Sequence, residues 1–129
     1  MNSYQKIGIT LLRVAVALQM IIHGVTRIAI GGVEGFGGFL AANHIPLGTL
    51  VAWAVTLSEI IGGLALAAGF FVMPLSCMFA AELFVGIVLV HFKEGWFVVG
   101  AGRNGMEYSV VLIAALASIA LTHFQKIKQ

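Results

Sequence analysis

The sequence predicts an all-α polytopic membrane protein, a four-transmembrane-helix bundle with a short interfacial segment between helices 1 and 2. The 129 residues are 60% hydrophobic and only 9% charged, whereas a soluble domain carries about 25% charged residues. The mean hydropathy of +1.06 is also too high for a disordered chain. The apolar residues fall in long runs, and a membrane helix needs about 20 residues. Four spans therefore fit into a single transmembrane domain covering 1–129.

Charge and cysteine content exclude several classes of function. The net charge of +2 comes from scattered Lys and Arg residues, so there is no basic patch for nucleic acid. Cys77 is the single cysteine, which excludes a CxxC redox pair and cysteine-ligated zinc or iron–sulfur centres within one chain. We therefore expect no intrinsic cofactor and no metal site.

The first span is predicted over about 7–30. Lys6 precedes an apolar run, as in a signal peptide, but the run is longer than a signal core and contains Arg13 and His23. We interpret it as a retained helix.

The apolar stretch from Leu47 to His91 is too long for one crossing. Gly69 suits a helix end, and Pro74 suits a first helical turn, where its missing N–H has no partner to lose. The sequence thus predicts spans over about 47–70 and 74–91, and a fourth over about 106–124.

Two loops face outward in this arrangement. The glycine-rich stretch 31–46 is predicted to hold the short interfacial segment. Trp96 lies in the second loop, 92–105, and suits an interfacial aromatic belt.

An even number of spans places both termini on one side of the membrane. Lys6, Lys126 and Lys128 favour the cytoplasm for that side.

Three charged residues are predicted to form a buried polar cluster: Arg13, Glu59 and Glu82. Counted from the cytoplasmic helix ends at about 1.5 Å per residue, they fall at similar depths in three spans. A guanidinium can serve two carboxylates at once, and intramembrane charges are functional candidates by default. The alternative is a static polar lock that fixes helix register.

A second polar group is predicted near the outer face. Its cation, carboxylate, imidazoles and aromatic rings can hydrogen-bond the carbonyl oxygens of a quinone and hold its ring. An ordinary interfacial girdle is the alternative. Haem or metal ligation is less favoured. Only one pair of histidines lies at matching depth, and the sequence has no closely spaced metal-ligand motif. The candidate ligand-binding residues are His23, Arg27, His91, Trp96, Glu107 and Tyr108, and no catalytic residue is assigned.

Small residues at helical spacing permit close helix approach in the second span. Gly62-Gly63 and the Ala65-xxx-Gly69 spacing are the clearest examples. The same face can serve contacts within the chain or a homo-oligomer.

A pattern of short motifs is spread along most of the chain. It comprises Leu11-Leu12-Arg13, His23-Gly24, Gly35-Phe36, Ile45-Pro46, Glu59 with Gly62-Gly63 and Gly69, Glu82, His91 with Gly95, and Glu107-Tyr108. In order and spacing the chain resembles the DoxX family of small four-helix inner-membrane proteins.

The resemblance implies a cytoplasmic (inner) membrane location and an association with redox chemistry. Some relatives are linked to thiosulfate:quinone oxidoreduction and others to membrane complexes that handle thiol and oxidative stress. The tail here is short and lacks the Gly-Pro and Tyr-Ser ending of many relatives. The family's polar bundle positions carry over to Arg13, His23, Glu59, Glu82, His91, Glu107 and Tyr108.

The function predicted from these features is a redox-associated membrane subunit that binds a quinone or another lipid-soluble small molecule. Partner oxidoreductase subunits would supply the electrons, because the chain has no recognisable redox centre of its own. The alternatives are a small proton-coupled transporter and a non-catalytic scaffold in the lipid bilayer that docks soluble enzymes.

Overall fold

The structure is a computed structural model that describes residues 1–101 and 103–127. Within them, the predicted all-α fold with four spans is confirmed. Lys128, used above to orient the termini, lies outside the described residues. The helices long and apolar enough to cross a membrane are Ser3–Ala29, Gly48–Ala68, Val72–Glu94 and Glu107–Phe124.

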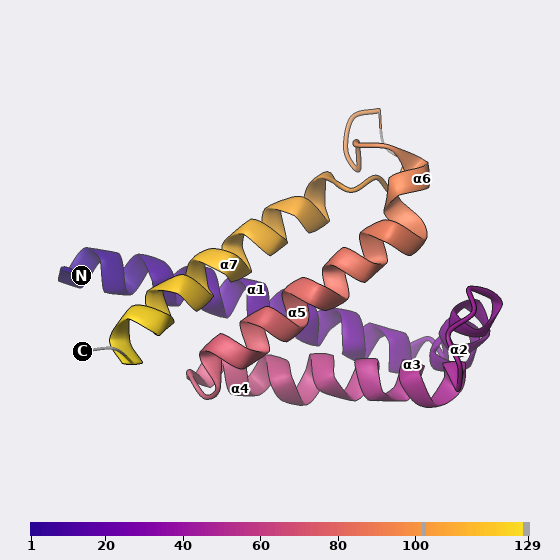
Figure 1. Cartoon of the computed structure of the whole chain (residues 1–129), viewed down its shortest axis with the longest axis horizontal. Helices are drawn as coiled ribbons and strands as arrows, with labels where there is room; N and C mark the ends of the chain where they lie inside the picture. The colour runs from indigo at the N-terminus through magenta and orange to yellow at the C-terminus, as the bar shows by residue number, and fades with distance from the viewer. Residues whose placement is uncertain (102, 128–129) are drawn as a thin grey trace. The chain divides into compact units, whose positions relative to one another are not determined.

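Two of the spans contain a turn of π-helix. The short helix α2 (Val33–Ala42) joins the first two spans (Figure 1). The elements in chain order are α1 (Ser3–Ala29), α2 (Val33–Ala42), α3 (Gly48–Leu57), η1 (Ser58–Gly62), α4 (Gly63–Ala68), α5 (Val72–Gly86), η2 (Ile87–His91), α6 (Phe92–Glu94) and α7 (Glu107–Ile127).

The helix boundaries follow the glycine and proline signals of the sequence. Gly69 ends α4 in the left-handed region with φ 91°, where glycine has no Cβ to strain. Pro74 lies in the first turn of α5, which begins at Val72, as predicted. The expected segment between the first two spans is the ten-residue helix α2.

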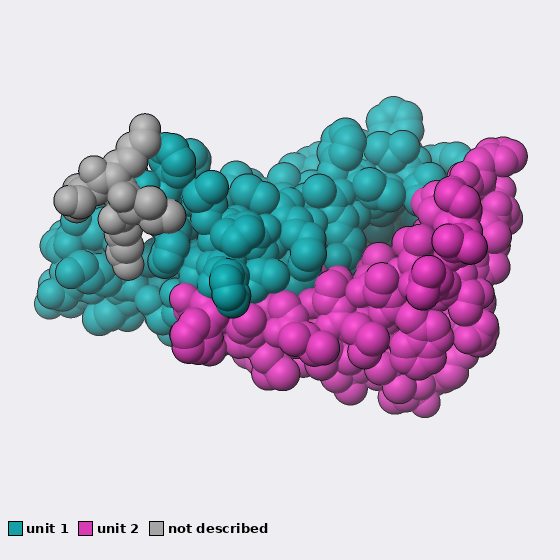
Figure 2. All heavy atoms as spheres, turned by 60° about the horizontal axis from the view of Figure 1, so that its bottom comes forward, with its two compact units in different colours: residues 1–16, 71–129 teal, residues 17–70 magenta. Residues whose placement is uncertain are grey.

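The chain forms two compact units, which Figure 2 shows in different colours. Unit 2 comprises residues 17–70, and unit 1 comprises residues 1–16 and 71–129. Helix α1 contributes its first part to unit 1 and the remainder to unit 2. Each unit has its own buried residues and is described by itself.

In unit 2, one helical face of the second span is buried from α3 through η1 to α4. The helices of unit 2 approach one another closely because glycines lie where they touch. A Cβ built on Gly48 would lie 2.2 Å from the carbonyl oxygen of Gly37, so α2 and α3 meet backbone to backbone. Likewise a Cβ on Gly63 would lie 3.2 Å from the carbonyl oxygen of Ala17 on α1. The buried face includes Ala52, Thr56, Glu59, Gly63 and Leu66.

In unit 1, α5 packs against α7. Each helix buries residues spaced three or four apart, which places them on one face. The residues involved are Val72, Ser76 and Phe79 on α5, with Ser109, Leu112, Leu116 and Ile119 on α7.

Large apolar side chains cover much of the exposed surface of the spans. Leu11 is 65% exposed, Leu64 is 58% exposed and Val111 is 64% exposed. Such side chains suit contact with lipid rather than water, so the helices have the surface that a bilayer requires.

Candidate functional site

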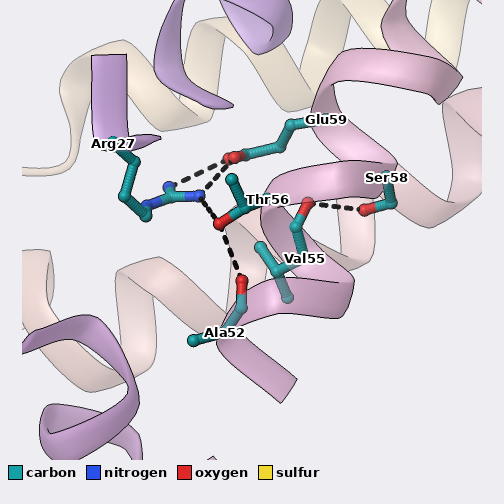
Figure 3. Close-up of polar contacts among 6 residues, drawn as sticks. All are labelled: Arg27, Ala52, Val55, Thr56, Ser58 and Glu59. Carbon is teal, nitrogen blue, oxygen red and sulfur yellow. Dashed lines mark hydrogen bonds and ion pairs between the residues drawn. The ribbon is translucent and has the colours of Figure 1, made fainter. Parts of the chain in front are cut away.

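A buried ion pair joins α1 to the π-helical turn η1 in unit 2. Arg27 donates through Nη1 to Oε2 of Glu59 and through Nη2 to Oε1 at 3.2 Å (Figure 3). The Glu59 side chain is only 5% exposed and that of Arg27 is 18% exposed. This two-bond arrangement of guanidinium and carboxylate fixes both side chains in orientation.

Thr56 extends the pair into a short hydrogen-bond network. Arg27 Nη1 also donates to Thr56 Oγ1 at 2.9 Å, and that hydroxyl donates to the carbonyl oxygen of Ala52 at 2.7 Å. The Thr56 proton is thus committed to the backbone, which leaves the hydroxyl oxygen to accept from the guanidinium. Nearby Ser58 bonds instead to the carbonyl oxygen of Val55 (Figure 3).

An aromatic ring from α2 completes the surroundings of the guanidinium. The central carbon of Arg27 lies 4.7 Å from the ring centroid of Phe36, within the range of a cation–π contact. Helix α2 therefore contributes to the site. The three helical segments α1, α2 and α3–η1 meet at this one side chain.

Gly24 explains how α1 comes near enough to make these bonds. A Cβ on Gly24 would lie 2.9 Å from the carbonyl oxygen of Thr56 and 3.2 Å from Cβ of Glu59. Only a residue without a side chain allows this approach. Arg27 lies three positions further along α1, hence on the same face of the helix.

Glu59 lies in the π-helical turn η1. A π-helical turn inserts extra backbone into an α-helix and is frequent at functional sites. Glu59 and Thr56 both lie on the buried face of the span, so the two oxygen-bearing side chains point toward Arg27 together.

The structure gives Glu59 a partner that differs from the sequence-based expectation. The sequence predicts Glu59 beside Arg13 and Glu82, whereas Arg27 is the cation that bonds to it. Arg13 and Glu82 belong to unit 1, where both are partly buried and each has an interaction of its own; their grouping with Glu59 stays a prediction. The sequence predicts Arg27 in the outer polar group, but in the structure its guanidinium bonds to the buried Glu59.

The other members of the predicted outer group divide between the two units. His23 is exposed on α1 in unit 2, one turn before Arg27. Trp96 and Tyr108 in unit 1 are 47% and 41% exposed. A ligand contact by these three residues stays a prediction.

His91 and Glu107 are engaged by the loop that joins α6 to α7. His91 Nδ1 bonds to the carbonyl oxygen of Asn104 at 2.8 Å, so this nitrogen carries the proton, because a carbonyl only accepts. Oε1 of Glu107 accepts from the backbone N–H groups of Val98 at 2.7 Å and Val99 at 3.0 Å. Both side chains therefore organise the loop.

Phe36 and Thr56 belong to the site although neither is among the residues predicted for it from the sequence. Thr56 precedes Glu59 by three positions, the spacing of one helical face. Phe36 belongs to the Gly35-Phe36 motif, but sequence spacing alone cannot show that α2 turns this ring toward Arg27.

The network retains hydrogen-bond donors. A guanidinium has five N–H groups, and the hydrogen bonds of Arg27 to described residues use three of them. The donors that are left lie beside an aromatic ring and a carboxylate. Among described residues no group of three His, Cys, Asp or Glu side chains is placed to hold a metal ion.

Comparisons with known proteins agree with this architecture. The sequence profile of the DoxX family matches residues 8–92. The chain is also 26% identical over 122 residues, 95% of this chain and 84% of the relative, to a Bacillus subtilis (strain 168) protein named "Putative oxidoreductase CatD". No solved structure matches the chain significantly. The matched segment runs from residue 8 within α1 to just past η2 and includes every residue of the Arg27 network, and the chain belongs to the DoxX family.

Proposed function

We propose that this DoxX protein binds a quinone, or another lipid-soluble carbonyl compound, at Arg27 and works as the membrane subunit of a redox system. The observation that carries the proposal is the buried Arg27–Glu59 pair with the Phe36 ring against the guanidinium. A charge pair inside an apolar span is costly unless it is well bonded. An ion pair that only fixed the helix register would not need the further N–H donors that Arg27 retains.

The chemistry of a quinone matches that of the site. A quinone has two carbonyl oxygens, which accept hydrogen bonds, on a flat ring that stacks against aromatic side chains. The uncommitted N–H groups of Arg27 would donate to one carbonyl oxygen. The Phe36 ring would hold the quinone ring, and Glu59 would pass on, one after the other, the two protons that accompany reduction to the quinol.

The redox association rests on the family and on the relative's printed name. Reduction of a quinone to a quinol takes up two electrons and two protons. Cys77 is the single cysteine of the chain, so this chain cannot supply electrons through a cysteine pair. A partner oxidoreductase would deliver the electrons, while this chain binds the quinone and supplies the route for protons.

The test uses the whole chain purified in detergent. Quinone extracted with the protein is identified by mass spectrometry, and a short-chain quinone is then titrated while tryptophan fluorescence is followed. Trp53 lies one turn before Thr56 on α3, so its fluorescence reports on this site. A Trp96→Phe background removes the signal of the other tryptophan, which belongs to unit 1 and not to the Arg27 network proposed to bind the quinone.

Saturable quenching of Trp53 is expected in that background and in the control Glu34→Gln, which alters an exposed carboxylate on α2. Arg27→Lys keeps the charge but loses the fork of N–H groups, and Phe36→Leu removes the ring. Both variants should bind the quinone about tenfold more weakly. Absence of co-purified quinone together with non-saturable quenching would refute the proposal.

A further inference from the structure

A second candidate ligand site lies within unit 1 and shares no residue with the Arg27 network. A cavity of about 90 Å³, room for several water-sized groups, opens between α1, α5 and α7. Its floor is apolar, because Val72 and Ile119 are 2% and 1% exposed. The function proposed above makes no use of it.

The titratable side chains that line this cavity are all basic. Lys6 and Arg13 come from α1, and His123 comes from α7, whereas no Asp or Glu occurs among the described lining residues. Lys6 and Arg13 are cationic side chains that only donate hydrogen bonds. The lining therefore favours an anion over a cation or a neutral ligand.

The α1 side of the cavity presents its polar groups along one helical stripe. Lys6, Thr10 and Arg13 follow one another at intervals of four and three, which places them on one face. Lys6 and Arg13 are about 10 Å apart along the axis. Lys6 is exposed near the helix start, and Arg13 is partly buried further in.

The donors suit an oxyanion with several oxygens. A guanidinium offers five N–H groups and can serve a ligand beside a partner within the protein. Arg13 and His123 do have other interactions, so they would add to binding without being dedicated to it. Lys6 and the hydroxyl of Thr10 would supply the donors nearest the helix start.

We propose that this cavity binds a phosphate group, supplied either by an anionic lipid headgroup or by free phosphate. Phosphate matches the positive lining, the hydrogen-bond donors and the volume. A lipid phosphate would lie near Lys6, with its acyl chains against the apolar sides of the spans. Free phosphate would enter from the aqueous side at the same end of α1.

The test compares phosphatidylglycerol with phosphatidylcholine bound to the whole chain, measured by native mass spectrometry in detergent. The wild type should retain phosphatidylglycerol about tenfold better, the effect of one or two charge-assisted hydrogen bonds. Lys6→Gln should abolish most of this preference. Lys93→Gln, which removes an exposed positive charge on α6, should leave it intact.

A competition with inorganic phosphate distinguishes the two sources. If inorganic phosphate displaces phosphatidylglycerol, or binds by itself and this binding is lost in Lys6→Gln, the ligand is the free anion. If added phosphate does not alter the retention of phosphatidylglycerol, the ligand is the lipid headgroup. Equal retention by Lys6→Gln and Lys93→Gln, with no phosphate binding that depends on Lys6, overturns the proposal. Lys6 is exposed, so Lys6→Gln is expected to fold like the wild type.

Discussion

Gly24 brings the backbone of α1 against the backbone of Thr56. A Cβ added to Gly24 would lie 2.9 Å from the carbonyl oxygen of Thr56, closer than real side chains allow. The contact sets the register of α1 against α3 and η1. Arg27, one turn further along α1, thereby reaches Thr56 and Glu59.

Replacing Gly24 with alanine should separate α1 from η1 and weaken the whole network. The added methyl group would meet Ile60, the Thr56 carbonyl and Glu59, and overpacking of this kind costs about 1–3 kcal/mol. The measurement is the free energy of unfolding in detergent, followed by circular dichroism.

The control for Gly24→Ala is Gly38→Ala on α2. A Cβ at Gly38 has open space around it, and alanine is the better helix former by roughly 1 kcal/mol. Gly38→Ala should therefore be neutral or stabilising. Equal loss of stability in both variants would mean that helix approach at Gly24 is not the cause.

Neutralising Arg27 alone should destabilise the protein more than neutralising both members of the pair. Arg27→Gln leaves Glu59 as a buried carboxylate without its cation, which costs about 3–5 kcal/mol. In Arg27→Gln/Glu59→Gln two neutral amides can bond to each other, so much of the loss should be recovered. The free energies of unfolding of Arg27→Gln, Glu59→Gln and the double variant together give the coupling energy between the two side chains.

The same double variant distinguishes a binding site from a static lock. It should regain stability without regaining quinone binding, because the charged donor and the proton-exchanging group are both gone. A double variant that recovers stability and also binds quinone like the wild type would show that the pair only locks the helices.

Most of the fold could be predicted from the sequence because it depends on local signals. The lengths of the apolar runs set the spans, Gly69 and Pro74 set the boundary between two of them, and a glycine-rich loop indicated the segment that became α2. Each signal acts within a few residues of the boundary that it defines.

The partner of Glu59 could not be predicted in this way because it depends on register between helices. Depths counted from helix ends assume that the ends are level, but α1 has 27 residues and the second span has 21. The glycine contact places Glu59 beside Gly24, one turn before Arg27 on α1. Helical side chains also lean toward the N-terminus, which takes Arg27 back toward Glu59.

Replacing Glu107 with glutamine should loosen the loop between α6 and α7. The carboxylate holds the N–H groups of Val98 and Val99 through one oxygen, and an amide oxygen is a weaker acceptor than a carboxylate. The expected result is faster hydrogen exchange at these two amides, with exchange along α3 unchanged. Glu94→Gln is the control, because its exposed contact with Arg103 at 3.9 Å contributes little. Unchanged exchange in Glu107→Gln would contradict this role.

Thr56→Val tests whether the hydroxyl supports Arg27. Valine has nearly the shape of threonine but cannot accept from the guanidinium, so one buried N–H of Arg27 loses its partner at a cost of about 1–3 kcal/mol. Thr56→Ser keeps the hydroxyl and should recover most of the stability. Ser58→Ala removes a hydroxyl that bonds only to the backbone carbonyl of Val55 among described residues, so it should leave quinone binding unchanged. Binding that falls in Thr56→Val and returns in Thr56→Ser assigns the effect to the hydrogen bond, whereas equal losses in the two variants assign it to packing of the threonine methyl group.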